Sequence, residues 1–383
     1  MVTRSYRLIY PRDIRNYPGG GPVLGLTPLF APPILGGEKK ASILRNLFMP
    51  AMLLAALLFG TAGQPAMAQT LDAVRDRGFL VCGSSNPLSG FSQLDTDSRW
   101  SGFDVDLCRA LAAAIFGNPD LIEFRSYRGE ARFAPLQTGS VDVLMRNGAW
   151  TAGRDTRYGA RYVAPSFFDG QAFLVPQSLG VVSAYELDNV SICVVDGFGE
   201  LQALDDFFFS NQTTFQEVVY EEAADLLVAY RAGLCQVISA SGRQLQAFRR
   251  ELQDPALHRI LPERISKEVL GPVVRQDDDE WFEIVRWTMF ALITAEEVGV
   301  TSLNIDSLSA ARTPAVRRIL GLEGDYGSAL RLRPTFMSDA IRAVGNYAEL
   351  YDRNFGPQTG AAMLRGQNAL WSNGGLLYAP PIM

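Results

Sequence analysis

Histidine is almost absent from this chain of 383 residues, because His258 is the only one. A Ser-His-Asp or Cys-His catalytic arrangement needs a histidine base, and His258 lies in a polar stretch that predicts an exposed position. Cysteine is scarce as well, since the chain has four and no C-x-x-C pair. A zinc site is therefore not expected, and we expect no cofactor.

Apolar runs long enough to cross a bilayer are also missing. The uncharged apolar run at residues 47–59 holds thirteen residues, whereas a membrane-spanning helix needs about 20. This run follows Lys39, Lys40 and Arg45, and the small residues after it end in Ala66-Met67-Ala68. That order is typical of a secretory signal peptide. We therefore predict that residues 1–68 form a leader that is cleaved after Ala68.

Basic residues are in the minority, with 35 Lys and Arg against 41 Asp and Glu. The leader carries seven of the basic and two of the acidic residues, so its removal changes the formal charge from −6 to −11. Nucleic acids and anionic membrane surfaces are therefore poor partners. The remaining 315 residues exceed one average domain, and we expect two lobes with separate cores.

All four cysteines lie beyond the leader, in a part of the chain that would meet an oxidising compartment. Three pairings are possible in principle. Pairing of neighbours, Cys82 with Cys108 and Cys193 with Cys235, would keep each bridge within one lobe, and this is the arrangement that we predict. Four buried free thiols are the alternative.

Strand and helix patterns alternate along the mature chain, which favours an α/β fold with mainly parallel sheets. Apolar strands at residues 171–175 and 266–274 would carry the chain from one lobe to the other and back. Residues 69–176 would then form the first part of lobe 1, residues 177–267 lobe 2, and residues 268–383 the return to lobe 1 with a helical C-terminal extension. Ligands of such folds bind in the crevice between the lobes.

The segment from Arg146 to Asp155 carries the clearest sign of a ligand site. It follows an apolar run directly, so a strand would end in a Gly-containing turn that opens a short helix. Backbone amides at such a corner, together with the guanidinium of Arg154, would hold a carboxylate. An arginine in a first helical turn is also a common solvated surface residue, and that alternative stays open.

Matches to one known family run in order through nearly all of residues 70–383. They include Gly102-Phe103-Asp104-Val105-Asp106, Arg132-Phe133, Arg154-Asp155-Thr156, Phe168-Asp169-Gly170-Gln171, Ile265-Ser266-Lys267-Glu268 and Asn368-Ala369-Leu370-Trp371. On these residues the chain resembles the periplasmic amino-acid-binding proteins of ABC transporters, in particular the general L-amino-acid-binding subfamily. The resemblance implies a type II periplasmic binding protein fold, in which two α/β lobes, each a mainly parallel sheet flanked by helices, are joined by two hinge strands.

The resemblance also implies where the ligand lies in lobe 1. In that family an arginine at the position of Arg154 holds the α-carboxylate of the ligand, helped by hydroxyls and amides of the preceding turn. This assigns ligand contacts to Arg154 and Thr151 and, through backbone groups only, to Gly148 and Ala149. The subfamily usually has two threonines where this chain has Gly148 and Ala149.

In lobe 2 the resemblance places the ligand near Phe198 and Gly199, where residues 197–200 replace a Gly-Thr-Thr-Thr helix start. Ser241 stands where the aspartate that binds the ligand ammonium is expected. We expect Phe198 to supply an aromatic wall. A ligand that lacks the ammonium or carries a bulky apolar group would suit this pocket.

Four further residues have competing interpretations. Phe91 corresponds to an aromatic residue that often covers the ligand, but a place in the core is nearly as well supported. Arg146 could contact the ligand or pair with a carboxylate beneath the site. Asp104 and Asp106 resemble a paired carboxylate site, but helix capping and a surface salt bridge are favoured by their spacing.

The implied function is that of a periplasmic substrate-binding subunit, which captures amino acids or related small carboxylates by hinge closure. It would act as a monomer and serve an inner-membrane ABC permease with its ATPase, without covalent chemistry. Two alternatives stay open. One is a periplasmic cyclohexadienyl dehydratase-like enzyme with Glu200 or Asp196 as the acid. The other is a duplicated binding protein that acts as a sensor or has lost ligand binding.

Overall fold

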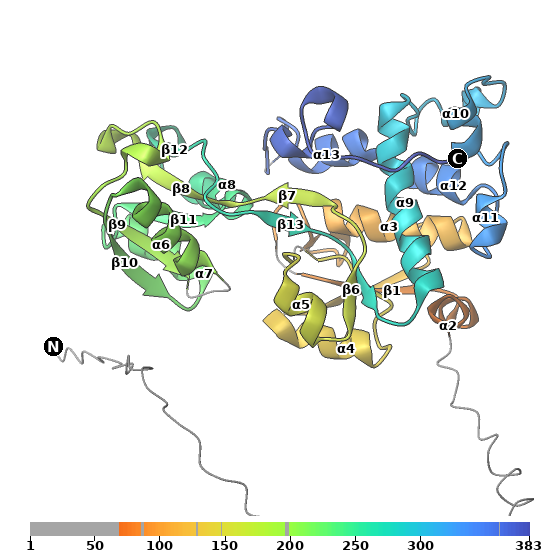
Figure 1. The fold of residues 1–383 in the computed structure, drawn as a ribbon, viewed down its shortest axis with the longest axis horizontal. Helices are drawn as coiled ribbons and strands as arrows, with labels where there is room; N and C mark the ends of the chain where they lie inside the picture. The colour runs from red at the N-terminus through yellow and green to blue at the C-terminus, as the bar shows by residue number, and fades with distance from the viewer. Residues whose placement is uncertain (1–68, 86–87, 128, 147, 196–198, 360) are drawn as a thin grey trace, which may run out of the picture. The chain divides into compact units, whose positions relative to one another are not determined.

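The computed structural model describes residues 69–85, 88–127, 129–146, 148–195, 199–359 and 361–383. The leader predicted for residues 1–68 lies outside the described residues. The rest of the chain forms two α/β lobes connected by a pair of strands (Figure 1). The predicted fold class is therefore confirmed, since each lobe is built on a sheet whose first three strands are parallel.

Lobe 1 contains a five-stranded sheet in the order β4-β1-β5-β14-β6. Its strands are β1 (Leu80–Ser84), β4 (Ile122–Ser126), β5 (Val143–Leu144), β6 (Ala160–Tyr162) and β14 (Val273–Arg275). The first three are parallel to one another, whereas β14 is antiparallel to both β5 and β6. Because β14 follows lobe 2 in the chain, this sheet is completed only after the chain has returned.

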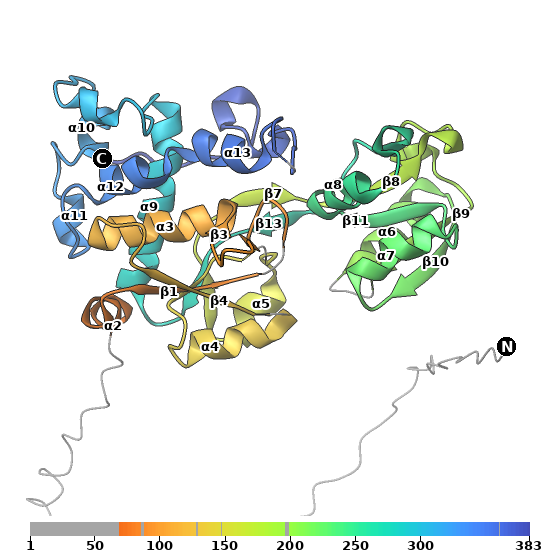
Figure 2. The ribbon, with the colours of Figure 1, turned by 180° about the vertical axis from the view of Figure 1, so that it is seen from behind.

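The helices of lobe 1 fall into two groups on either side of this sheet. They are α2 (Thr70–Arg77), α3 (Phe103–Phe116), α4 (Phe133–Gln137), α5 (Ala152–Arg157), α9 (Asp279–Glu297), α10 (Pro314–Ile319), α11 (Tyr326–Ala329), α12 (Phe336–Val344) and α13 (Tyr347–Phe355). Figures 1 and 2 show α3 between the sheet and the C-terminal helices α12 and α13, with α4 and α5 on the other side. The alanine-rich α3 is buried over most of its length, because small side chains let neighbouring helices approach it closely.

Lobe 2 contains a five-stranded sheet in the order β10-β9-β11-β8-β12. The strands are β8 (Gln171–Pro176), β9 (Val190–Val195), β10 (Phe215–Tyr220), β11 (Val237–Ser241) and β12 (His258–Ile260). The helices are α6 (Glu200–Asn211), α7 (Ala223–Arg231) and α8 (Gly242–Glu251), and all three pack on this sheet. His258, expected to be exposed, is half-buried at the start of β12, and its Nδ1 lies 2.8 Å from the hydroxyl of Tyr230.

Two short strands carry the chain between the lobes, β7 (Phe167–Asp169) on the way out and β13 (Glu268–Leu270) on the way back. The strand beginning at Gln171 does not make this crossing, because it is buried in the lobe 2 sheet and pairs with β11. The boundary expected after Pro176 thus lies near Gly170. A Cβ atom at Gly170 would lie 2.4 Å from the carbonyl oxygen of Ser266, so a glycine allows the two crossing segments to pass closely.

Both predicted disulfides are present. Cys82 is bonded to Cys108, which joins β1 to α3 in lobe 1, and Cys193 is bonded to Cys235 in lobe 2. The neighbouring-pair prediction is confirmed, and the alternative of four free thiols is wrong.

A short antiparallel pair, β2 (Gln93–Leu94) and β3 (Trp100–Ser101), precedes α3. The described residues contain no helix that is both long and apolar enough to cross a membrane. They also contain no group of three or more His, Cys, Asp or Glu side chains that could hold a metal ion.

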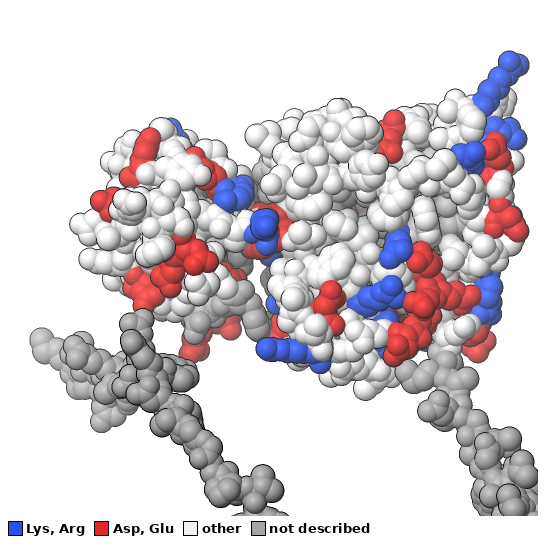
Figure 3. All heavy atoms as spheres, in the orientation of Figure 1, with Lys and Arg blue, Asp and Glu red and all other residues white. Residues whose placement is uncertain are grey.

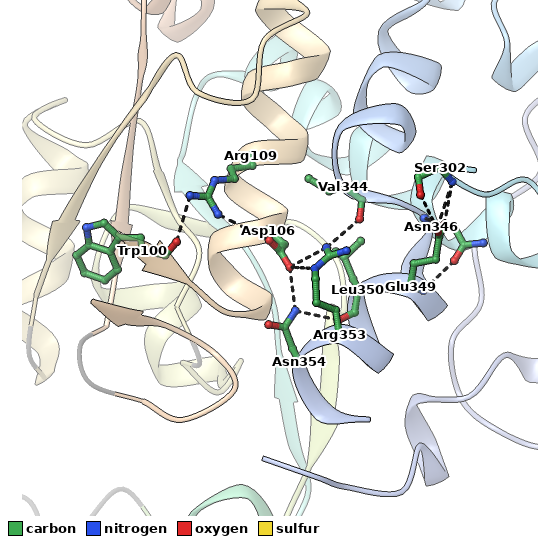
Figure 4. Close-up of polar contacts among 10 residues, drawn as sticks. All are labelled: Trp100, Asp106, Arg109, Ser302, Val344, Asn346, Glu349, Leu350, Arg353 and Asn354. Atoms are coloured by element: carbon green, nitrogen blue, oxygen red, sulfur yellow. Dashed lines mark hydrogen bonds and ion pairs between the residues drawn. The ribbon is translucent and has the colours of Figure 1, made fainter. Parts of the chain in front are cut away.

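Asp106 ties the C-terminal helices to the core of lobe 1 (Figure 4). It lies in the first turn of α3 and accepts hydrogen bonds from Nε and Nη2 of Arg353, at 3.1 and 2.8 Å, and from Nδ2 of Asn354 at 2.9 Å. Its carboxylate is nearly buried, so the interaction is more than the surface salt bridge expected from the sequence. Asp104 is also buried, with 4% of its surface exposed.

Replacement of Asp106 by Asn should lower the free energy of unfolding by about 1 to 2 kcal/mol, because it removes charge-assisted acceptors of three hydrogen bonds. We place the effect at the low end because half of the Arg353 side chain is exposed. Denaturant unfolding would measure it. Asp97→Asn is the control, since Asp97 pairs with Arg99 at the surface, and a change within about 0.5 kcal/mol is expected. Equal changes in the two variants would contradict the anchoring role.

Candidate ligand-binding site

A cavity of about 250 Å³ is lined by residues of both lobes and of the returning crossing segment. The lining residues are Arg132, Arg146, Gly148, Ala149, Thr151, Arg154, Gln171, Gly199, Glu200, Arg243, Ser266, Lys267 and Glu268. In Figure 3 basic side chains lie where the two lobes meet, near the crossing strands of Figure 1. Larger hollows of about 570 and 900 Å³ lie beside Asp106 and His258, each within one lobe, and contain none of the predicted ligand contacts.

Arg154 and Thr151 both line the cavity, as the sequence analysis expected. The Thr151 hydroxyl accepts a hydrogen bond from the amide of Arg154 at 3.3 Å and so caps α5. The guanidinium of Arg154 donates to the carbonyl of Ala149 at 2.8 Å and to Glu130 at 2.9 Å. These contacts fix the orientation of Arg154 towards the cavity.

Two further arginines lie beside Arg154. Arg132 is 3% exposed and its Nη2 lies 3.3 Å from the same oxygen of Glu130 that Arg154 contacts. Burial, and then the positive charge of Arg154, lowers the pKa of Arg132. Burial, and then the charge of Arg132, lowers the pKa of Arg146 to about 10. Three guanidinium groups therefore share a partly desolvated site, where an anion would be favourable.

Sequence reasoning did not assign Arg132 to the site, although the residue belongs to the Arg132-Phe133 match. Its place depends on the 3₁₀ turn Gly129–Arg132, which brings it under the loop after β5. The guanidinium also lies over the ring of Phe133, at 4.5 Å from the ring centroid. The signal available in the sequence was the Arg132-Phe133 pair, an arginine next to an aromatic residue.

Gly148 and Ala149 both line the cavity, and the missing side chain of Gly148 leaves room for Arg132. A Cβ atom at Gly148 would lie 3.2 Å from Nη2 of Arg132 and 3.5 Å from the hydroxyl of Tyr162. The carbonyl of Ala149 accepts from Tyr162 at 2.8 Å as well as from Arg154. The amide of Trp150 is bonded to Val269 of β13, so this amide of the predicted corner is already engaged.

Lobe 2 contributes Gly199 and Glu200, at the start of α6, and Gln171 at the start of β8. Gly199 has a φ of 109°, a conformation that favours glycine. Burial raises the pKa of Glu200, and the nearby carboxylate of Glu268 acts in the same direction. Phe198, predicted to form an aromatic wall, lies outside the described residues.

Phe91 and Ser241 do not line the cavity. Phe91 is fully buried among Phe103, Phe167 and Phe355, so it belongs to the aromatic core of lobe 1. Ser241 is 4% exposed and its hydroxyl lies 3.0 Å from Oε1 of Gln244. It precedes the first residue of α8, and this turn directs it into the lobe rather than into the cavity.

Arg243 is a lining residue that the sequence analysis missed. Its Nη1 donates to Asp169 at 2.9 Å and to Glu268 at 2.8 Å, two residues that face each other across β7 and β13. Although burial by itself lowers the pKa of Arg243, the carboxylates of Glu268 and Asp169 raise it above its ordinary value. Arg243 thus links the first turn of α8 to both crossing strands.

The comparison with known families agrees with this architecture. Residues 80–300 match the bacterial extracellular solute-binding proteins, family 3. The chain belongs to this family. The matched range includes every residue that lines the cavity and both crossing strands.

Relatives within this family extend over nearly the whole chain. The chain is 42% identical over 341 residues to the general L-amino acid-binding periplasmic protein AapJ of Rhizobium johnstonii, covering 88% of this chain and 100% of the relative. It is 44% identical over 338 residues to the glutamate/glutamine/aspartate/asparagine-binding protein BztA of Rhodobacter capsulatus, covering 88% and 99%. The predicted resemblance to the amino-acid-binding proteins of ABC transporters is thereby confirmed.

A solved structure is similar as well. It is the ABC transporter periplasmic binding protein from Brucella ovis with glutathione bound, at 40% identity and a TM-score of 0.76. The match covers 82% of this chain and 100% of that one. A periplasmic binding protein of known structure is therefore similar to this chain over most of its length.

Proposed function

We propose that this chain is the periplasmic substrate-binding subunit of an ABC transporter and that it captures amino acids or related small carboxylates. The observation that carries the proposal is the joint lining of one cavity, with Arg154 and Thr151 from lobe 1 and Gly199 and Glu200 from lobe 2. A ligand that contacts both lobes binds the closed arrangement best and shifts the population towards it. The amino-acid ligands in the names of two relatives support the same ligand class.

The proposed contacts divide between the lobes. Arg154 would hold a carboxylate, with Arg146 beside it and Thr151, Gly148 and Ala149 around it. In lobe 2, Gly199 would approach the ligand closely. Phe198 remains a predicted contact. Ser241 would not touch the ligand, and it would affect binding only through the conformation of the turn before α8.

Replacement of Arg154 by Met should weaken ligand binding about 10- to 100-fold, because a charge-assisted hydrogen bond to a carboxylate contributes about 1.5 to 3 kcal/mol. Titration calorimetry on protein purified from the periplasm would measure the change. Arg157→Met is a matched control, since Arg157 lies on the same helix and is exposed. Thermal unfolding without ligand would separate lost binding from lost folding. Unchanged affinity in a folded Arg154→Met variant would contradict the assignment.

We also propose that the protein is not an enzyme. Glu200 is the described residue best suited to act as a general acid, because burial raises its pKa. Incubation with prephenate should nevertheless leave the substrate unchanged. Release of phenylpyruvate that is abolished by Glu200→Gln would favour the dehydratase-like alternative instead.

Location and partners follow from the same proposal. The leader would be cleaved after Ala68, the mature monomer would reside in the periplasm, and its closed form would bind an inner-membrane permease with its ATPase. N-terminal sequencing of the exported protein tests the cleavage site. Ligand-dependent stimulation of the ATPase in proteoliposomes would support transport, and its absence would favour the sensor alternative.

A further inference from the structure

Basic side chains dominate the wall of the cavity. Of the thirteen residues that line it, five are cationic and two are acidic. The cationic residues are Arg132, Arg146, Arg154, Arg243 and Lys267. One carboxylate can be held by one guanidinium in a bidentate manner. Glu130 pairs with Arg132 and Arg154, and Asp169 and Glu268 pair with Arg243. Arg146 and Lys267 form no ion pair with the described residues, so a ligand with a single carboxylate would pair with only one of them.

Two guanidinium nitrogens in this wall are buried without a partner. They are Nε of Arg146 in lobe 1 and Nε of Arg243 in lobe 2, and neither donates a hydrogen bond to any of the described residues. Buried polar groups in proteins are nearly always hydrogen-bonded, so each exception needs an explanation. A ligand oxygen is an acceptor that would satisfy such a donor.

The two acidic residues of the wall differ in how far they are engaged. Glu268 already accepts a hydrogen bond from Arg243 at 2.8 Å. Burial raises the pKa of Glu200, and its Oε2 accepts no hydrogen bond from the described residues, so one acceptor is open to a donor of the ligand such as the ammonium of L-glutamate. Ser241, which stands where an acidic residue was expected, is neutral and contacts Gln244.

Arg132, Arg146 and Arg154 form one group of cations in lobe 1, and they lie in the 3₁₀ turn before α4, in the loop after β5 and in α5 respectively. Arg243 and Lys267 form the other group, on α8 and on the segment that enters β13. Lys267 is the only lysine beyond residue 40. The two groups belong to different parts of the fold and meet only at the cavity.

We propose that the cavity is specific for a dicarboxylate, with one carboxylate held by Arg146 and Arg154 and the other by Arg243 and Lys267. The inference rests on the proposed function and deepens it by naming the ligand class. Each carboxylate neutralises one group of cations, so the dianion joins lobe 1 to lobe 2. A ligand with one carboxylate leaves Lys267 and Nε of Arg243 without a ligand acceptor.

Matched ligand pairs test this directly by titration calorimetry with protein purified from the periplasm. L-Glutamate and L-glutamine differ only in the second carboxylate, as do glutarate and its monoamide, and glutathione and its monoethyl ester. The expected result is at least tenfold tighter binding of the dicarboxylate within a pair. Equal or tighter binding of the neutral partners would overturn the inference but leave the proposed function intact. A folded protein that binds no member of any pair would overturn both.

Variants of the second group of cations give an independent test. Lys267→Met keeps most of the length of the unbranched side chain and removes its charge. It should weaken L-glutamate at least tenfold and L-glutamine less than threefold. Arg125→Met, on the far strand β4, is the control. A preference for L-glutamate that survives Lys267→Met undiminished would overturn the inference.

The scarcity of lysine permits a second readout. After removal of the leader, Lys267 and the N-terminal amine are the only primary amines. Amine-reactive labelling followed by mass spectrometry should show Lys267 protected by L-glutamate and exposed in its absence. Labelling of Lys267 that is unchanged at saturating L-glutamate would overturn its role.

Discussion

Replacement of Arg243 by Met is expected to lower the free energy of unfolding by about 3 to 5 kcal/mol, because it leaves a buried carboxylate without its partner. Arg243 pairs with Asp169, whose side chain is 2% exposed, and with Glu268, which is 18% exposed. Methionine fills a similar volume but supplies no charge. The loss of stability therefore comes from the unpaired carboxylates and not from an empty volume in the core.

Denaturant unfolding measures this effect, and Arg312→Met is the control, because Arg312 lies in an exposed loop where a change within about 0.5 kcal/mol is expected. Adding Asp169→Asn to Arg243→Met should restore part of the lost stability, since the double variant no longer buries that charge. A single Arg243→Met variant as stable as the control would contradict the role of Arg243 in linking α8 to the two crossing strands.

Removal of the disulfides should have the second large effect. The loop closed by Cys82 and Cys108 spans 26 residues and that closed by Cys193 and Cys235 spans 42. In the chain-entropy description such bonds stabilise the folded state by about 3.5 to 4 kcal/mol each. Ser substitution of either pair should therefore lower the unfolding midpoint by several degrees, and the larger loss is expected for the longer loop.

The comparison of the two pairs also tests their independence. Each bridge lies within one lobe, so the two losses of stability should add in the variant without cysteines. Unfolding in guanidinium with and without reductant would measure the combined loss for the unsubstituted protein. A reduced protein as stable as the oxidised one would contradict the structural role of both bonds.

The sequence predicts the fold well because its signals are local or cumulative. The alternation of strands and helices, the glycines that end the helices and the separation of the cysteines all act within one lobe. The crossing strands were harder to predict. The apolar run at 171–175 has the composition of a connecting strand, but it is buried in the sheet of lobe 2. The actual connection, β7, is three residues long and ends beside Gly170.

The lining of the cavity could be predicted only in part, for a physical reason. Arg154 and Thr151 follow a strand directly, so their position can be derived from the local pattern. Arg132 and Arg243 reach the cavity through contacts between segments far apart in the chain, which no spacing reveals. Phe91 was predicted as a ligand contact, but it lies in the core. An aromatic residue in a loop has the same sequence context in the core and at a ligand.

The most direct test of the central claim is thermal unfolding of protein purified from the periplasm, in the presence of amino acids and small carboxylates. A ligand at about 100 times its Kd adds about 2.7 kcal/mol to the free energy of unfolding. We expect a rise of several degrees in Tm with at least one carboxylate-bearing ligand, and a smaller rise in the Arg154→Met variant. A Tm that no such ligand changes would contradict the proposal that this cavity captures a solute.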